Sequence, residues 1–167
     1  MDVIEETILS LLRTDPFYAS ILMQLDRVYM DIPASAGVVY NIKEGTVFLA
    51  VNEKLFKGFS INHRKVILEH ECLHLIFKHF LRAKKREQIR WNLATDMAAN
   101  SFLSNLPEGA ILPTLFKFEP NQSAEEYYKL LPPLKKRYIL LDCHDGWKEG
   151  ESLETLEGLI KSIVKNA

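Results

Sequence analysis

Hydrophobic positions along the first fifty residues change from a helical to a strand-like period. In residues 3–13 apolar side chains recur every three to four positions, which predicts an amphipathic helix that Asp15-Pro16 ends. Residues 17–25 predict a second short helix. Three runs rich in Val, Tyr, Phe and Thr then predict strands at residues 27–31, 37–41 and 46–52. The turn at 42–45 favours a small antiparallel sheet with a hairpin.

The remainder of the chain is mainly helical in pattern. The longest predicted helix covers residues 62–83, with Ser60 or Asn62 as its N-cap. Residues 138–142 predict one more strand. Neither a repeat nor a linker divides the chain, so we expect a single α+β domain over residues 1–167. Further helices are predicted at residues 91–104, at 123–131 with a capping box of Ser123 and Glu126, and at 151–165.

Composition and charge narrow the class of protein. The formal net charge is -1, from 21 basic and 22 acidic side chains, which argues against a nucleic-acid partner. No apolar run approaches the ~20 residues of a spanning helix, so we expect no membrane partner. Two cysteines, Cys72 and Cys143, are too few for a disulfide framework, and the acidic N-terminus lacks the basic start of a signal peptide. These features favour a cytoplasmic protein.

Residues 70–74 read His-Glu-Cys-Leu-His, an HExxH motif inside the longest predicted helix. Residues four apart lie on one helix face, so His70 and His74 can reach the same metal ion. Neutral imidazoles suit Zn²⁺, and Glu71 can take a proton from metal-activated water. The motif therefore predicts hydrolysis of peptide bonds. The alternative is a buried helix with two hydrogen-bonded histidines.

A catalytic zinc needs a third protein ligand and an open position. Positions 77 and 80 are both Phe, so the HExxHxxGxxH arrangement is excluded. The helix predicted next carries one carboxylate, Asp96, among small apolar residues where a lone charge is unfavourable. Asp96 is the candidate third ligand, with an exposed helix flank as the alternative. Asn100, one turn later, either hydrogen-bonds a ligand or lies on the surface.

Two further histidines need separate interpretations. His79 follows His74 by five residues, a rotation of about 140° on a continuous helix, so we expect it to anchor the helix end or a loop. His144 lies in the run DCHDGW at 142–147, after the last predicted strand. It could act as a catalytic residue that stabilises a tetrahedral oxyanion, occupy the open metal position, or belong to a structural turn.

Six segments occur in an order found in a known family: AGVVYNIKEGTVFLAVN, LEHECLHLIFKHFLR, IRWNLATDMAANSFL, LPEGAILP, SAEEYYKLL and DCHDGW. In this order the chain resembles the metallopeptidase domain of bacteria and phages that precedes a von Willebrand A-type domain in longer relatives. The resemblance implies a minimal zincin-like fold, with a small antiparallel sheet packed on the HExxH helix and a following ligand-bearing helix. It implies that the metal ligands and catalytic base are His70, His74 and Asp96 with Glu71. Further motif positions are His79, Arg82, Trp91, Asn92 and Asn100.

We therefore expect a zinc-dependent metallopeptidase that acts on a peptide or protein substrate. The strand at 46–52 would lie beside the HExxH helix and offer an edge to an extended peptide. The alternative is a non-catalytic zinc-binding scaffold that docks a protein partner. The resemblance implies an AAA-type ATPase as that partner.

Overall fold

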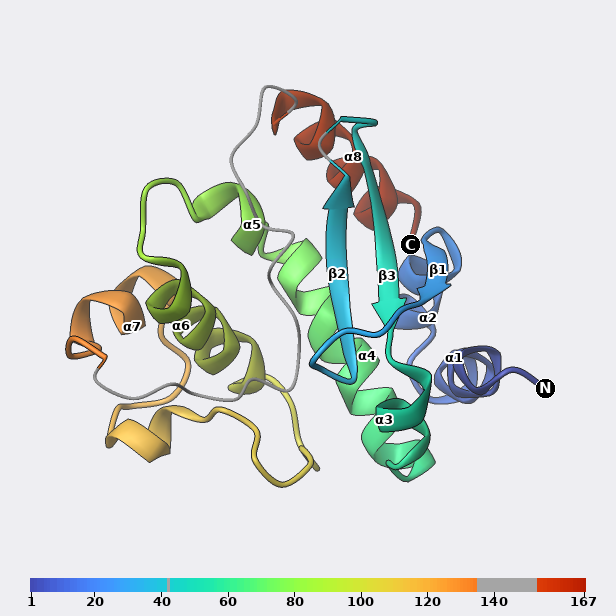
Figure 1. The fold of residues 1–167 in the computed structure, drawn as a ribbon, viewed down its shortest axis with the longest axis horizontal. Coiled ribbons are helices and arrows are strands. Elements are labelled where there is room, and N and C mark those ends of the chain that lie inside the picture. The colour runs from blue at the N-terminus through green and yellow to red at the C-terminus, as the bar shows by residue number, and fades with distance from the viewer. Residues whose placement is uncertain (42, 135–152) are drawn as a thin grey trace.

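The chain folds as an α+β protein in which a long helix separates a small sheet from a pair of helices (Figure 1). The computed structural model describes residues 1–41, 43–134 and 153–167. Its strands are β1 (Asp26–Tyr29), β2 (Ala36–Asn41) and β3 (Thr46–Val51). Its helices are α1 (Val3–Thr14), α2 (Pro16–Met23), α3 (Glu53–Lys57), α4 (Ile61–Ile76), α5 (His79–Arg82), α6 (Gln88–Asn100), the 3₁₀ helix η1 (Pro113–Phe116), α7 (Ala124–Leu130) and α8 (Leu153–Asn166).

Local signals set the ends of the first two helices. The Asp2 side chain accepts the backbone N–H groups of Ile4 and Glu5 and so caps α1. Pro16 occupies the first turn of α2, where its missing N–H has no helical partner to lose. Both helices pack against α4. The two predicted N-terminal helices are confirmed.

The sheet is mixed, with strand order β1-β3-β2. β2 and β3 form the predicted antiparallel hairpin, with Val38 opposite Leu49. β1 pairs with β3 in parallel, with Val28 opposite Ala50, so the prediction of a wholly antiparallel sheet is wrong. Residues 30–35 connect β1 to β2 across the end of the sheet. This connection is long enough to leave room for one strand between β1 and β2, and β3 occupies that place.

The central place of β3 also corrects the expected peptide edge. β3 is hydrogen-bonded to β2 on one side and, over residues 48–51, to β1 on the other, so this stretch offers no edge to an extended peptide. The strand next to α4 is β2 (Figure 1). Strand order depends on tertiary pairing, and the continuous apolar run at residues 47–51 does not specify which strands lie on either side of β3.

The helix predicted over 62–83 is divided into α4 and α5. α4 starts after Ser60, whose hydroxyl accepts the backbone N–H of His63. It ends before Lys78, which has the left-handed conformation with φ 52° and ψ 40°. This conformation stops the helical hydrogen-bond ladder and is unfavourable by about 1–2 kcal/mol for a residue with a Cβ. Phe80 continues the apolar pattern across the break and is buried, which explains the prediction of one helix.

The second layer consists of α6 and α7, which pack against each other on the far side of α4 from the sheet (Figure 1). α6 begins after Glu87, whose carboxylate accepts the N–H groups of Ile89 and Arg90, and every residue from Trp91 to Asn100 is buried. The predicted capping box of α7 is present. α8 confirms the predicted C-terminal helix and packs on α2, α4 and β3. The strand predicted at 138–142 lies outside the described residues.

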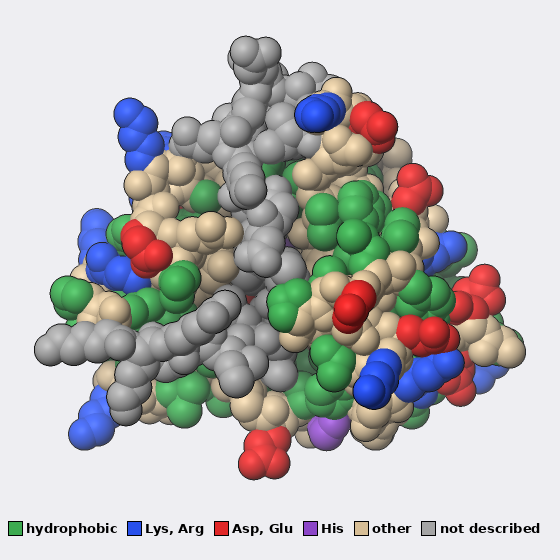
Figure 2. Space-filling model, viewed as in Figure 1, with side chains coloured by type: hydrophobic (Ala, Val, Ile, Leu, Met, Phe, Trp, Pro, Cys, Tyr) green, Lys and Arg blue, Asp and Glu red, His purple; other side chains and the backbone are tan. Residues whose placement is uncertain are grey.

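The described surface mixes charges of both signs. Figure 2 shows Lys and Arg alongside Asp and Glu over the described part of one face. This distribution agrees with the near balance of 21 basic and 22 acidic side chains in the sequence. Within the described ranges, no helix has the length and hydropathy that crossing a membrane requires.

Candidate metal centre

Three side chains with metal-binding atoms meet between α4 and α6. His70 and His74 lie one turn apart on α4, and Asp96 faces them from α6. The Nε2 atoms of His70 and His74 are 2.8 Å apart. The Oδ1 atom of Asp96 lies 3.7 Å from Nε2 of His70 and 3.4 Å from Nε2 of His74. All three residues are buried, so the residues proposed from the sequence come together in space.

The spacing and chemistry of this group suit one small cation. Tetrahedral bonds of about 2.0–2.1 Å place ligand atoms about 3.3–3.4 Å apart, close to the two distances from Asp96. The two imidazole nitrogens are closer and would separate by about 0.5 Å to reach that spacing. Two imidazoles and one carboxylate form a donor set that Zn²⁺ accepts in proteins. The residues present therefore fit a zinc ion with a fourth position left over.

His70 is held from behind by Asn100. Its Nδ1 lies 2.6 Å from Oδ1 of Asn100, while Nδ2 of Asn100 donates to the carbonyl of Ile111 at 2.8 Å. The second bond fixes the orientation of the amide, so the oxygen faces the imidazole. Because this oxygen only accepts, the proton of His70 resides on Nδ1 and its Nε2 carries the lone pair. Of the two alternatives for Asn100, the hydrogen bond with a candidate ligand is the one present, with His70 donating and Asn100 accepting.

Glu71 lies beside the three converging groups and is anchored to the sheet. Its side chain is fully buried, and Oε2 accepts the backbone N–H of Val38 in β2 at 2.8 Å. It does not belong to the set of residues whose donor atoms converge on one point. A buried carboxylate with a fixed backbone donor is suited to proton transfer more than to metal binding.

A cavity of about 20 Å³ opens next to this group. That volume accommodates about one water molecule. Glu71 and Asn100 line it on one side, and the segment 106–111 forms an apolar wall on the other. Gly109 has φ 90°, a conformation that favours glycine, and so turns this segment. The Leu-Pro-Glu-Gly run marks a tight turn in the sequence, but its apolar residues alone do not predict that they line the site.

A family model described as "Putative metallopeptidase domain" matches residues 4–152. The chain belongs to this family. Comparisons with curated proteins and with solved structures found no match. The family and the convergence of His70, His74 and Asp96 agree on a metal-binding role for this chain.

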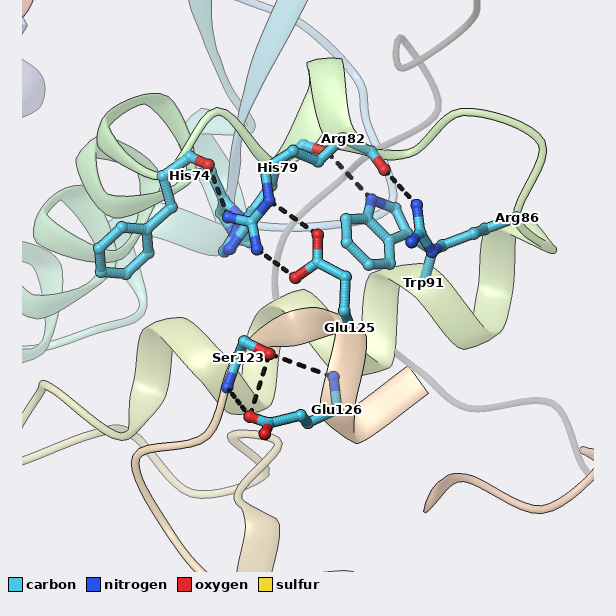
Figure 3. Close-up of polar contacts among 9 residues, drawn as sticks. His74, His79, Arg82, Arg86, Trp91, Ser123, Glu125 and Glu126 are labelled. Atoms are coloured by element: carbon cyan, nitrogen blue, oxygen red, sulfur yellow. Dashed lines mark hydrogen bonds and ion pairs between the residues drawn. The ribbon is translucent and has the colours of Figure 1, made fainter. Parts of the chain in front are cut away.

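Other motif residues connect α5 to its neighbours (Figure 3). The indole Nε1 of Trp91 donates to the carbonyl of His79 at 3.0 Å. Arg82 donates to the carbonyl of Phe77 at 2.8 Å and forms an ion pair with Glu125 of α7. These contacts position the short helix that follows the HExxH helix.

Asn92 lies one turn before Asp96 on α6, as Asn100 lies one turn after it. Its Oδ1 is buried without a hydrogen-bond partner in the part of the chain that the structure describes. Three polar side chains thus recur every four residues, and Thr95 is the one other polar residue of α6 between Trp91 and Asn100. Their burial explains why α6 lacks the polar outer face that a surface helix has.

Three residues near the motif behave differently from the candidate ligands. His79 does not join the converging set, as expected, but its Nδ1 lies 2.8 Å from Nδ1 of His74. Burial, followed by the charge of Glu71, raises the pKa of the Cys72 thiol, which therefore stays protonated in the core. The same two causes raise the pKa of Tyr40, a β2 residue that the sequence analysis did not single out. His144 lies outside the described residues.

Proposed function

We propose that this chain is a zinc-dependent peptidase in which Glu71 acts as general base. The observation that carries the proposal is the buried Glu71 carboxylate, anchored at Val38 beside three converging donor groups. A Zn²⁺ ion held by His70, His74 and Asp96 would polarise a peptide carbonyl and lower the pKa of a water molecule.

Glu71 would handle the proton in this reaction. Its Oε2 accepts the Val38 N–H, and this bond fixes the orientation of the carboxylate. A carboxylate in one orientation can accept a proton from the attacking water and then deliver it to the leaving amine. Both transfers use the same carboxyl group, so no other acid is needed among the described residues.

The two histidines would keep their lone pairs directed to the centre. Asn100 holds the proton of His70 on Nδ1, and the outer face of His74 meets His79. Both rings are buried, so the packing around them limits their rotation. Orientation of this kind raises the affinity of a histidine for metal without any change in the ligand itself.

The proposal is tested by metal analysis and peptide cleavage with the purified chain. We expect about one zinc per chain and cleavage within a broad fluorogenic peptide library that a chelator abolishes. Glu71→Gln is the matched variant, because the amide keeps the size of the side chain and leaves the candidate ligands intact. It should retain zinc and lose cleavage.

Two outcomes would contradict the peptidase assignment. Cleavage at the wild-type rate by Glu71→Gln would remove Glu71 as the base. Zinc at one equivalent with no cleavage of any library member would leave a metal-binding scaffold, which is the second function that the sequence allows.

A further inference from the structure

His79 touches the outer face of the candidate ligand His74. The two Nδ1 atoms are 2.8 Å apart, and the ring centres are 5.0 Å apart with planes inclined at 65°. His74 is fully buried and His79 is 1% exposed, so bulk water does not compete for this contact. At this distance one imidazole nitrogen donates a proton and the other accepts it.

The geometry at the centre decides which ring donates. Nε2 of His74 faces Nε2 of His70 and Oδ1 of Asp96, so this nitrogen supplies the lone pair for a metal ion. The proton of neutral His74 is then on Nδ1 and points at His79. His79 must accept on Nδ1, which places its own proton on Nε2.

We propose that His79 is a positioning residue of the metal centre, which holds His74 in the Nδ1–H tautomer and directs Nε2 to the other ligands. The inference rests on the metal site of the proposed function. It assigns His79 no contact with metal or substrate, because it acts only through His74.

The break between α4 and α5 is what brings the two rings together. On a continuous helix, five residues would turn His79 by about 140° away from His74. The left-handed Lys78 redirects the chain, and His79 begins a new short helix. A backbone conformation of this kind at a residue with a Cβ is typical of sites where the chain must place a group against its local preference.

Contacts from two other helices hold the backbone of His79 in place (Figure 3). Trp91 of α6 donates to the carbonyl of His79 itself. Arg82 bridges the carbonyl of Phe77 and the carboxylate of Glu125 in α7. Contacts of α5 with α6 and α7 therefore hold His79, the acceptor for His74, in place before any metal binds. A preorganised site requires such an arrangement.

The test compares two substitutions at position 79. In His79→Asn the amide oxygen can take the place of Nδ1, because both atoms are bonded to Cγ. In His79→Phe an aromatic ring remains at this position, but the nitrogen that accepts from His74 is lost. We expect His79→Phe to weaken zinc binding about 10–100-fold in a chelator competition, and His79→Asn to stay within about threefold of wild type.

The pair of variants separates positioning from packing. Asn is the smaller side chain, so a packing effect would make His79→Asn the weaker binder, which would overturn the inference. Equal zinc affinity of wild type and His79→Phe would overturn it as well. If wild type itself binds no zinc, the proposed function fails before this comparison is reached.

If His79→Phe does not fold, a measurement on the zinc-loaded wild type decides. Long-range ¹H–¹⁵N NMR spectra distinguish the two neutral tautomers of each histidine. We expect the Nδ1–H form for His74 and the Nε2–H form for His79. The reverse assignment would overturn the inference.

Discussion

The Nδ1 atom of His70 and the Oδ1 atom of Asn100 lie 2.6 Å apart, and their contact joins two helices at the centre of the molecule. His70 belongs to the helix that carries HExxH, and Asn100 ends the helix that carries Asp96. The same two helices therefore supply the candidate ligands and the group that orients one of them. Because Asn100 is not a candidate ligand, substituting it tests the orientation of His70 while His70 itself stays unchanged.

Replacing Asn100 by Leu should weaken zinc binding about 10–100-fold, because His70 loses the acceptor that keeps its proton on Nδ1. Asn100→Asp is the control, since it retains an acceptor for His70 but loses the donor to Ile111. Chelator competition measures both affinities. A loss as large in Asn100→Asp as in Asn100→Leu would place the effect at Ile111 and contradict the prediction.

Zinc should raise the thermal stability of the wild-type chain and leave that of Asp96→Ala unchanged. A ligand that binds only the folded state stabilises it by about 2.7 kcal/mol when its concentration is 100 times Kd. Asp96→Ala removes a buried carboxylate 3.4 Å from His74 and with it one candidate ligand. Calorimetry with and without zinc gives the two shifts. An equal shift in both proteins would remove Asp96 from the site.

The free energy of unfolding of Lys78→Val should be lower than that of Lys78→Gly by about 1–2 kcal/mol. Glycine adopts the left-handed conformation of position 78 without strain, and a β-branched side chain resists it. The 3.5 Å ion pair with Glu157 is lost in both variants and so cancels in the comparison. Urea unfolding measures the difference, and equal values would contradict a conformational cause.

The ion pair between Arg82 and Glu125 should make the free energy of unfolding depend on pH in the acidic range. The Arg82 guanidinium holds the pKa of the Glu125 carboxyl below its usual range. A lowered pKa stabilises the fold at pH values above about 4.3, the usual value for Glu, and this contribution is lost as the pH falls through the lowered value.

We therefore expect Glu125→Gln to lower the free energy of unfolding at pH 7 by about 0.5–1 kcal/mol, a figure that allows for solvent screening of this partly exposed pair. The difference in free energy of unfolding between wild type and Glu125→Gln should become smaller below about pH 4.3 and then vanish. Denaturant titrations at several pH values provide the measurement. A gap that stays constant into acid would contradict the assignment.

The limits of the sequence are clearest at His79. The neighbouring placement of His70 and His74 follows from their spacing on any helix, and Ser60 and Ser123 mark helix starts by their side-chain chemistry. The left-handed turn at Lys78 has no such marker, because lysine is neither Gly nor Asn. The contact between His79 and His74 depends on that turn and on tertiary contacts from α6 and α7, so spacing alone argued against it.

In the sheet and in α6, local sequence likewise predicts some features, while others depend on tertiary contacts. The β2–β3 hairpin could be predicted from two β-rich runs and a short turn, whereas the parallel pairing of β1 depends on how residues 30–35 cross the sheet. Asp96 stood out as a lone carboxylate among apolar neighbours. The contact of Glu71 with Val38 joins residues 33 positions apart and has no local signature in the sequence.

The complete burial of α6 from Trp91 to Asn100 has a consequence for how this chain can diverge. A helix with one solvent face accepts new side chains at every third or fourth position, which is the pattern we expect for α1. α6 has no such face over these residues, so each position is constrained by the packing around it. In a library of single substitutions, the fraction of substitutions that still give a folded protein should therefore fall at Trp91. It should stay low at every position up to Asn100, without a helical period, and rise again at Ser101.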